Sequence, residues 1–138
     1  MGINNIILEV VTPYSQVVNE PVQIVMVPGI MGEFGILVGH TPFLSILKTG
    51  VLHFSDKKGN KKYVFINGGF AETLPDKVTV LAETAERNNE IDINRAKEAM
   101  KRAEERISKY LSGNKDIDFE RAKAALNRSI YRISIINA

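Results

Sequence analysis

Two nearly identical phrases in the second half of the chain hold the residues best suited to bind an anion. They read IDINRAKEAMKR, from residue 91, and IDFERAKAALNR, from residue 117. Each phrase places an aspartate, Asp92 or Asp118, where its side chain can cap a helix N-terminus. An arginine follows in the first turn, Arg95 or Arg121, where a cation opposes the helix dipole at a cost of about 0.3–1 kcal/mol. We therefore expect each arginine to be paired with a nearby carboxylate or a bound phosphate.

The apolar residues that follow each aspartate have the spacing of an amphipathic helix. Gly113, in the short connection SGNKD, is a natural C-terminal cap for the first helix. Two helices joined by so short a connection should be antiparallel. The expected contact faces are Ala96, Met100, Ala103, Ile107 and Leu111 in the first helix and Phe119, Ala122, Leu126, Ser129, Ile133 and Ile136 in the second.

The first part of the chain has a different pattern, in which short apolar runs are broken by turn residues, as is typical of strands. KKGNKK around Gly59, NGG from Asn67 and LPDK from Leu74 all suit tight turns. Many short strands without an intervening helix predict an antiparallel sandwich or flattened barrel. The expected strands are 6–12, 22–28, 34–38, 51–55, 62–67, 69–73 and 77–83.

The remaining residues offer no catalytic or metal site. The chain has no cysteine and two histidines, His40 and His53, neither of which has a partner at metal-ligand spacing. The segment PGIMGEFGILVGH is rich in glycine but lacks the lysine and Ser/Thr of a phosphate-binding loop. Glu33 and His40 could be imagined as an acid–base pair, but no nucleophile or oxyanion-stabilising group accompanies them. We therefore expect a protein that is not an enzyme.

Composition predicts a soluble globular protein that does not insert into a membrane. Apolar residues make up 44% and charged residues 25% of the 138 residues. No apolar run approaches the roughly 20 residues needed to cross a bilayer, and the first residues have no basic region or cleavage site. From residue 85 onward, twelve Lys and Arg face nine acids. This mixed surface is too weakly basic to predict nucleic-acid binding.

The order of motifs along the chain is specific. VPGIMGEFGILVGHTPFLSILKTGVL, from residue 27, is followed by INGGFAE from residue 66, KVTVLAETAE from residue 77 and IDINRA from residue 91. This order closely resembles the epsilon subunit of the bacterial F-type ATP synthase over essentially the whole chain. The resemblance implies a mainly β fold with a smaller α part. A flattened antiparallel β-sandwich of about ten strands is expected in residues 1–86, followed by an antiparallel two-helix hairpin in residues 87–138.

The resemblance also implies partners and a place in the cell. It implies a non-catalytic central-stalk subunit, peripheral to the cytoplasmic face of the bacterial membrane, whose sandwich contacts the gamma subunit and the c-ring. The hairpin would inhibit ATP hydrolysis when it extends toward the catalytic alpha and beta subunits. The implied contact residues are Met31, Glu33 and Phe34 for the c-ring and His40, Pro42 and Phe43 for gamma. Independently, the basic surface that carries Arg121 and Lys123 suits an acidic segment of the catalytic subunits.

No cofactor is required, but ATP is implied as a regulatory ligand that holds the hairpin in its folded-down form. Several bacterial members of the family bind ATP through a motif written Ile/Leu-Asp-x-x-Arg-Ala. Ile91, Asp92, Arg95 and Ala96 match that motif at every fixed position. The other implied nucleotide contacts are Glu86, Arg102, Arg128 and Arg132.

The main alternative is a β-sandwich ligand- or carbohydrate-binding module with an incidental helical tail. Such a module needs a row of exposed aromatic residues, whereas this chain has no Trp and its Tyr and Phe mostly lie within apolar runs. A nucleic-acid-binding protein that uses the basic helices is a second alternative, which the weak net charge disfavours.

Overall fold

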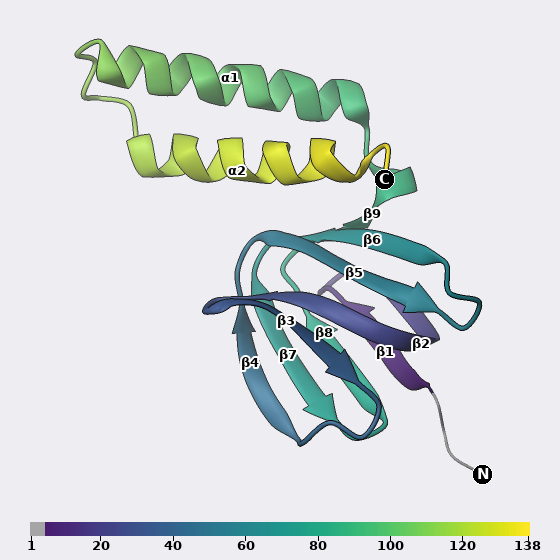
Figure 1. Cartoon of the computed structure of the whole chain (residues 1–138). Helices are drawn as coiled ribbons and strands as arrows, with labels where there is room; N and C mark the ends of the chain where they lie inside the picture. Colours follow the sequence, from purple (N-terminus) through teal and green to yellow (C-terminus); the bar gives the residue numbers. More distant parts are fainter. Residues whose placement is uncertain (1–4) are drawn as a thin grey trace. The chain divides into compact units, whose positions relative to one another are not determined.

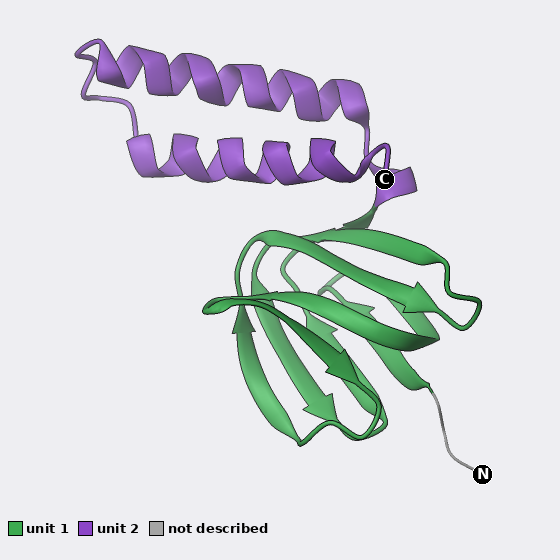
Figure 2. Cartoon of the chain, in the orientation of Figure 1, with its two compact units in different colours: residues 1–87 green, residues 88–138 purple. Residues whose placement is uncertain are grey.

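The computed structural model describes residues 5–138, and the chain forms two compact units, residues 1–87 and 88–138 (Figure 2). The predicted β-sandwich followed by a helical hairpin is confirmed (Figure 1). The described residues contain nine strands. These are β1 (Ile6–Val11), β2 (Gln16–Gly29), β3 (Gly32–Leu37), β4 (Phe43–Leu47), β5 (Gly50–Asp56), β6 (Lys61–Ile66), β7 (Gly69–Leu74), β8 (Lys77–Leu81) and β9 (Ala85–Arg87). They are followed by the 3-10 turn η1 (Asn88–Glu90) and the helices α1 (Ile93–Leu111) and α2 (Phe119–Ile135).

The strands of the first unit pair in the order β1-β8-β7-β4-β2-β5-β6-β9, and β3 pairs with β2. Strand β2 joins the two layers because its first half pairs with β1 and its second half with β3 and β5 (Figure 1). Most neighbours are antiparallel, but β1 and β8 are parallel. Two strands, β4 and β9, lie outside the segments that the sequence pattern predicted.

The core of the first unit comes from one face of each strand. In β1, Ile6, Leu8 and Val10 are fully buried, while Ile7 points to the other face and is exposed. The largest buried side chains include Phe54 on β5. Apolar side chains thus stand on both faces of some strands, which differs from a sheet with one apolar and one polar face.

One turn of the sandwich requires glycine. Gly69 has a φ of +130°, and a Cβ at this position would fall on the carbonyl oxygen of Leu81 and lie 2.9 Å from the Cα of Ala82. Gly68 also has a positive φ, of 67°. The NGG sequence therefore lets the chain reverse into β7 while its backbone lies against the end of β8.

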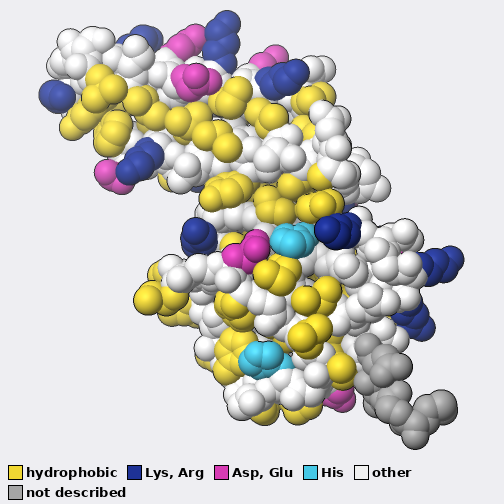
Figure 3. Space-filling model, viewed as in Figure 1, with side chains coloured by type: hydrophobic (Ala, Val, Ile, Leu, Met, Phe, Trp, Pro, Cys, Tyr) yellow, Lys and Arg dark blue, Asp and Glu magenta, His cyan; other side chains and the backbone are white. Residues whose placement is uncertain are grey.

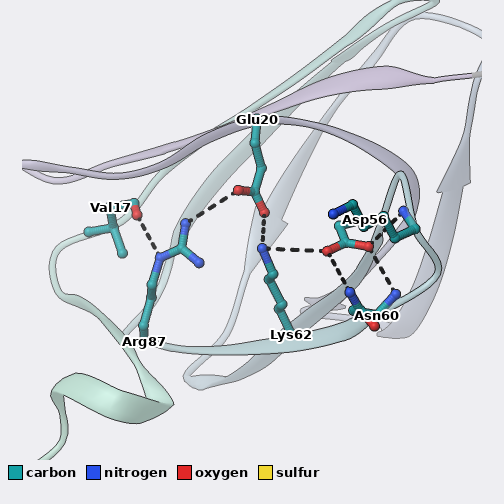
Figure 4. A network of polar contacts seen from close by, with 7 residues as sticks. Val17, Glu20, Asp56, Asn60, Lys62 and Arg87 are labelled. Carbon is teal, nitrogen blue, oxygen red and sulfur yellow. Dashed lines mark hydrogen bonds and ion pairs between the residues drawn. The ribbon is translucent and has the colours of Figure 1, made fainter.

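A polar network ties the last strand of the first unit to the sheet (Figure 4). The Nε of Arg87 donates to the carbonyl of Val17 at 3.0 Å, and its guanidinium lies 3.9 Å from Glu20. Lys62 then bridges Glu20, at 3.1 Å, and Asp56, at 3.6 Å. Because β9 has only three residues, these side-chain contacts supplement a short ladder with β6.

The second unit is the expected antiparallel pair of helices (Figure 1). Asp92 caps α1 by accepting from the backbone N–H groups of Asn94 and Arg95, both at 3.1 Å. Asp118 caps α2 by accepting from the N–H of Arg121 at 3.0 Å. The helices meet mainly through small residues, since the buried set in this unit is Ala96, Ala103, Ala122, Ser129 and Ile135.

We predict that Gly69→Ala destabilises the sandwich far more than Gly32→Ala. The two glycines have nearly equal φ angles, +130° and +131°, but a Cβ at Gly32 would meet nothing within 4 Å. Gly32→Ala should therefore show the conformational cost alone, about 1–3 kcal/mol. Gly69→Ala should add about 2 kcal/mol or more for the clash with β8. Urea unfolding of both variants measures the difference, and equal losses would show that close packing at Gly69 is unimportant.

A second prediction concerns acid stability at the β5–β6 hairpin. The backbone N–H of Asn60, at 2.9 Å, is the largest cause that holds the pKa of Asp56 below its usual 3.8, with help from the N–H of Lys58. A lowered pKa contributes stability above 3.8 that is lost as pH falls through the folded-state value. Asp56→Asn should therefore lower the free energy of unfolding at neutral pH. The further loss of stability as pH falls below 3.8 should be smaller in this variant than in the wild type.

The matched control for this measurement is Asp76→Asn. The side chain of Asp76 also lies at a tight turn but has no hydrogen bond or ion pair with any residue from 5 to 138. In this control, the free energy of unfolding should depend on pH, from acid to neutral, as it does in the wild type. The same smaller loss in both variants would contradict the role given to Asp56.

Candidate functional site

Four arginines from the two helices line one groove in the second unit. Arg102 and Arg106 come from successive turns of α1, and Arg121 and Arg128 come from α2. The groove has a volume of about 250 Å³. Its floor is made of Ala99, Ala103, Ala122 and Ala125, whose small side chains let the two helices approach closely.

The groove concentrates positive charge. Within residues 5–138, no carboxylate lies in ion-pair contact with the side chains of these four arginines. Guanidinium groups have planar, fixed donors that match phosphate or carboxylate oxygens. The arrangement therefore suits an anion with several oxygens better than a single carboxylate.

The opposite side of the helix seam is apolar. Ile107, Leu111 and Leu126 line a shallow hollow there, together with Glu104 and two serines. Figure 3 shows hydrophobic side chains along the seam between the two helices. The hairpin thus has a cationic groove on one side of the seam and, on the other, a hollow lined by apolar and polar residues.

The structure brings some of the predicted nucleotide contacts together and leaves others apart. Arg102 and Arg128 line the groove. Ala96 is buried in the helix seam, while Arg95 is exposed and does not line the groove. The others lie elsewhere: Asp92 caps α1, Ile91 precedes that cap, Arg132 is half-buried on α2, and Glu86 pairs with Phe65 in the β-sheet.

Sequence reasoning missed Arg106 and gave Arg121 to a different partner. The structure places Arg121 in the groove, whereas Lys123 is exposed outside it. The signal was present in the spacing, because Arg102 and Arg106 are four residues apart and Arg121 and Arg128 seven. Both spacings put two side chains on one helix face.

A second candidate site is an apolar row across the outer face of the sandwich. Ile46 on β4 lies opposite Phe70 on β7, and Phe70 lies opposite Leu81 on β8. Opposite residues share a face, and these three side chains are 53%, 48% and 53% exposed. Beside the row, Phe70 and Leu81 also line an apolar hollow of about 410 Å³ with Val11 and Pro13.

The predicted contact residues of the first unit lie in the β2–β3 turn and β3 (Met31, Glu33, Phe34) and in the β3–β4 connection and the start of β4 (His40, Pro42, Phe43). Met31, at the tip, is 96% exposed. The ring of Phe43 lies 5.5 Å from that of Phe34 and 4.9 Å from that of His40. Glu33 is exposed and its carboxylate lies 3.4 Å from His53, and Pro42 is also exposed.

In the part of the chain from residue 5 onward, no group of three or more His, Asp or Glu side chains is arranged to hold a metal ion. Over the same residues, neither helix is both long and apolar enough to cross a membrane.

Comparison with known proteins places both units in one family. The model for the beta-sandwich domain of the ATP synthase delta/epsilon chain matches residues 5–88, and the model for its long alpha-helix domain matches residues 89–137. The helical unit is therefore part of the family architecture and not an incidental tail.

Curated relatives and a solved structure agree with this result. The ATP synthase epsilon chain of Desulfatibacillum aliphaticivorans is 62% identical over 103 residues, covering 75% of this chain and 73% of that protein. The epsilon chain of Desulforapulum autotrophicum is 58% identical over 105 residues, covering 76% and 78%. A chain in the Euglena gracilis mitochondrial ATP synthase structure, of OSCP, F1 and c-ring, has a TM-score of 0.81 at 24% identity, covering 96% of this chain and 81% of that one. At that identity the likeness shows the fold.

The groove predicts that removing one of its charges stabilises the hairpin. At low salt, Arg121→Gln should stabilise the helical unit by about 0.2–0.5 kcal/mol for each like-charge neighbour relieved, and so raise its thermal midpoint. High salt should shrink the gain because it screens the repulsion. Lys123→Gln makes a similar change on the same helix outside the groove and should have a smaller effect. Circular dichroism melts measure both variants, and equal shifts would argue against repulsion in the groove.

Proposed function

The chain belongs to the family of ATP synthase epsilon subunits, and on that basis we propose that it is a non-catalytic rotor subunit that couples the c-ring to gamma and restrains ATP hydrolysis. The sandwich is the docking unit in this proposal, and the hairpin is the regulatory unit. The observation that carries the regulatory part is the groove of four arginines, which have no carboxylate partner among residues 5–138. ATP is the anion proposed for it.

The outer face of the sandwich supports the docking role. Ile46, Phe70 and Leu81 form an exposed apolar row that the chain itself leaves uncovered in its first unit. Exposed apolar patches of this kind mark protein interaction sites. We assign this face to gamma, together with the segment of His40 and Phe43, whose rings lie 4.9 Å apart.

The β2–β3 turn supports the contact with the c-ring. Met31 offers an unbranched apolar side chain that adapts to an irregular partner surface, and Glu33 offers a charge beside it. A charge at the edge of an interface contributes more to orientation and association rate than to affinity. Glu33 is thus proposed to select the orientation of the sandwich on the ring.

The hairpin supports regulation because its closed form has little to hold it. Its buried residues are mostly alanines, and the arginines across the groove repel one another. ATP phosphates in the groove would replace repulsion by charge-assisted hydrogen bonds. If ATP binds only the closed form, it favours that form by RT ln(1 + [L]/Kd), about 2.7 kcal/mol at a hundredfold excess over Kd. When ATP is scarce, the hairpin would open and reach the catalytic subunits at the cytoplasmic face of the membrane.

The docking assignment predicts that Phe70→Glu abolishes binding to gamma without unfolding the sandwich. Phe70 is half exposed, so its replacement leaves the core intact, while a buried unpaired charge at an interface costs several kcal/mol. Glu72→Gln, on the same strand and face, is the control and should bind normally. Co-purification with gamma reports the outcome. Normal recovery of gamma with Phe70→Glu would place the interface elsewhere.

The regulatory assignment predicts one result for nucleotide binding and one for ATP hydrolysis. Titration calorimetry of the full chain should show ATP binding, and Arg121→Gln should weaken it because one phosphate-directed donor is lost. A chain that ends at Asn89 should still join the ATP synthase but release its ATP hydrolysis from restraint. Absence of heat at millimolar ATP would contradict the proposal that ATP binds the hairpin. Unchanged ATP hydrolysis in the truncated complex would contradict the proposal that the hairpin restrains hydrolysis.

A further inference from the structure

The turn between the two helices contains an aromatic and cationic contact that the proposed function does not use. Tyr110 near the end of α1 and Phe119 at the start of α2 stack with ring centroids 4.8 Å apart and an interplanar angle of 23°. The Nζ of Lys115, in the connection, lies 4.0 Å from the centroid of the Tyr110 ring. The same Nζ donates to the Tyr110 carbonyl at 3.3 Å. We call these three residues the turn clasp.

The backbone of the turn is closed by its own hydrogen bonds. The N–H of Gly113 donates to the carbonyl of Tyr110 at 3.1 Å, and the N–H of Asn114 donates to that of Lys109 at 3.0 Å. Gly113 has a φ of +120°, which glycine adopts readily. The turn therefore satisfies the last carbonyls of α1 and holds Lys115 beside the Tyr110 ring.

Elsewhere in the helix pair the buried residues are mostly small. Apart from Ile135 they are alanines and Ser129, and Ser129 satisfies its hydroxyl within α2 by donating to the carbonyl of Ala125 at 3.0 Å. The groove arginines add repulsion between the helices. The large side chains that join α1 to α2 by a ring contact within residues 5–138 are those of the turn clasp.

We propose that the turn clasp sets the equilibrium between a closed and an opened hairpin. Because the aromatic contact lies at the turn, we expect the hairpin to open first at the other end, where α1 begins and α2 ends. Breaking the stack between Tyr110 and Phe119 removes the aromatic contact that joins the helices at the turn. The regulatory meaning of this device rests on the proposed function, but the opening itself can be measured in the isolated chain.

The experiment uses the absence of cysteine from the sequence. Spin labels are attached at Lys97→Cys on α1 and Ser134→Cys on α2, both exposed positions near the end that should open. Pulsed electron spin resonance then gives the distance distribution in the full chain. Phe119→Ala removes the stack and, since alanine favours helices, does not weaken α2 itself. Tyr110→Phe keeps the ring and serves as the control.

Phe119→Ala should raise the ratio of open to closed hairpin about tenfold, the upper range for an aromatic pair. Lys115→Met, which keeps the apolar stem and leaves both helices intact, should raise it about threefold. Tyr110→Phe should leave the distribution unchanged. The proposal is overturned if neither Phe119→Ala nor Lys115→Met increases the open fraction. If both variants increase the open fraction while ATP hydrolysis by the assembled complex stays the same, the role of the turn clasp is supported and the proposed regulatory function is contradicted.

Discussion

Closing α1 onto α2 brings four guanidinium groups to one groove that has no carboxylate partner within the described residues. This constraint governs the second unit, because the buried contacts that oppose the repulsion come mostly from alanine and serine. A small apolar area stabilises little, at about 25 cal/mol per Å². The closed hairpin is therefore a state that we expect to depend on a bound anion as well as on the turn clasp. Differences of a few kcal/mol are enough to move such an element between two states.

The first unit has the opposite character. Its core of large side chains, such as Phe54 and Leu52, is complete within the sandwich. On its outer face, however, the apolar side chains of Ile46, Phe70 and Leu81 form an exposed row. A unit that has its own core and exposes an apolar row is suited to permanent attachment. A unit that closes weakly is suited to regulation, and the chain joins the two just after Arg87, which is fixed by Val17 and Glu20.

Much of this fold was predictable from local chemistry. Asp92 and Asp118 cap the helices as expected, and Gly59 and Gly69 have the positive φ angles that their turns require. Helical periodicity predicted the seam but not its ends. Leu111 belongs to the predicted face and is 70% exposed, whereas Ile135 lies off that face and is buried.

Strand β4 was missed because its apolar residues lie on both faces and show no alternation. Strand β9 was missed because its sequence, AER, has no apolar run and depends on pairing with β6.

The candidate sites were less predictable because they depend on which surfaces meet. The motif around Arg95 predicted a nucleotide contact there. The groove, however, is built from Arg102, Arg106, Arg121 and Arg128. Spacing shows that two arginines share a face of one helix, but only the packing of α1 against α2 makes the two faces converge. The apolar row likewise needs the register of β4, β7 and β8, which no single strand reveals.

The most direct test of a hairpin that depends on an anion is hydrogen exchange of its backbone amides in the full chain, with and without ATP. We predict that amides of α1 and α2 exchange faster than those of the sandwich core when ATP is absent. At a hundredfold excess of ATP over Kd, hairpin exchange should slow by roughly a hundredfold, while exchange in the sandwich stays the same. Hairpin amides that are as protected without ATP as with it would contradict this dependence.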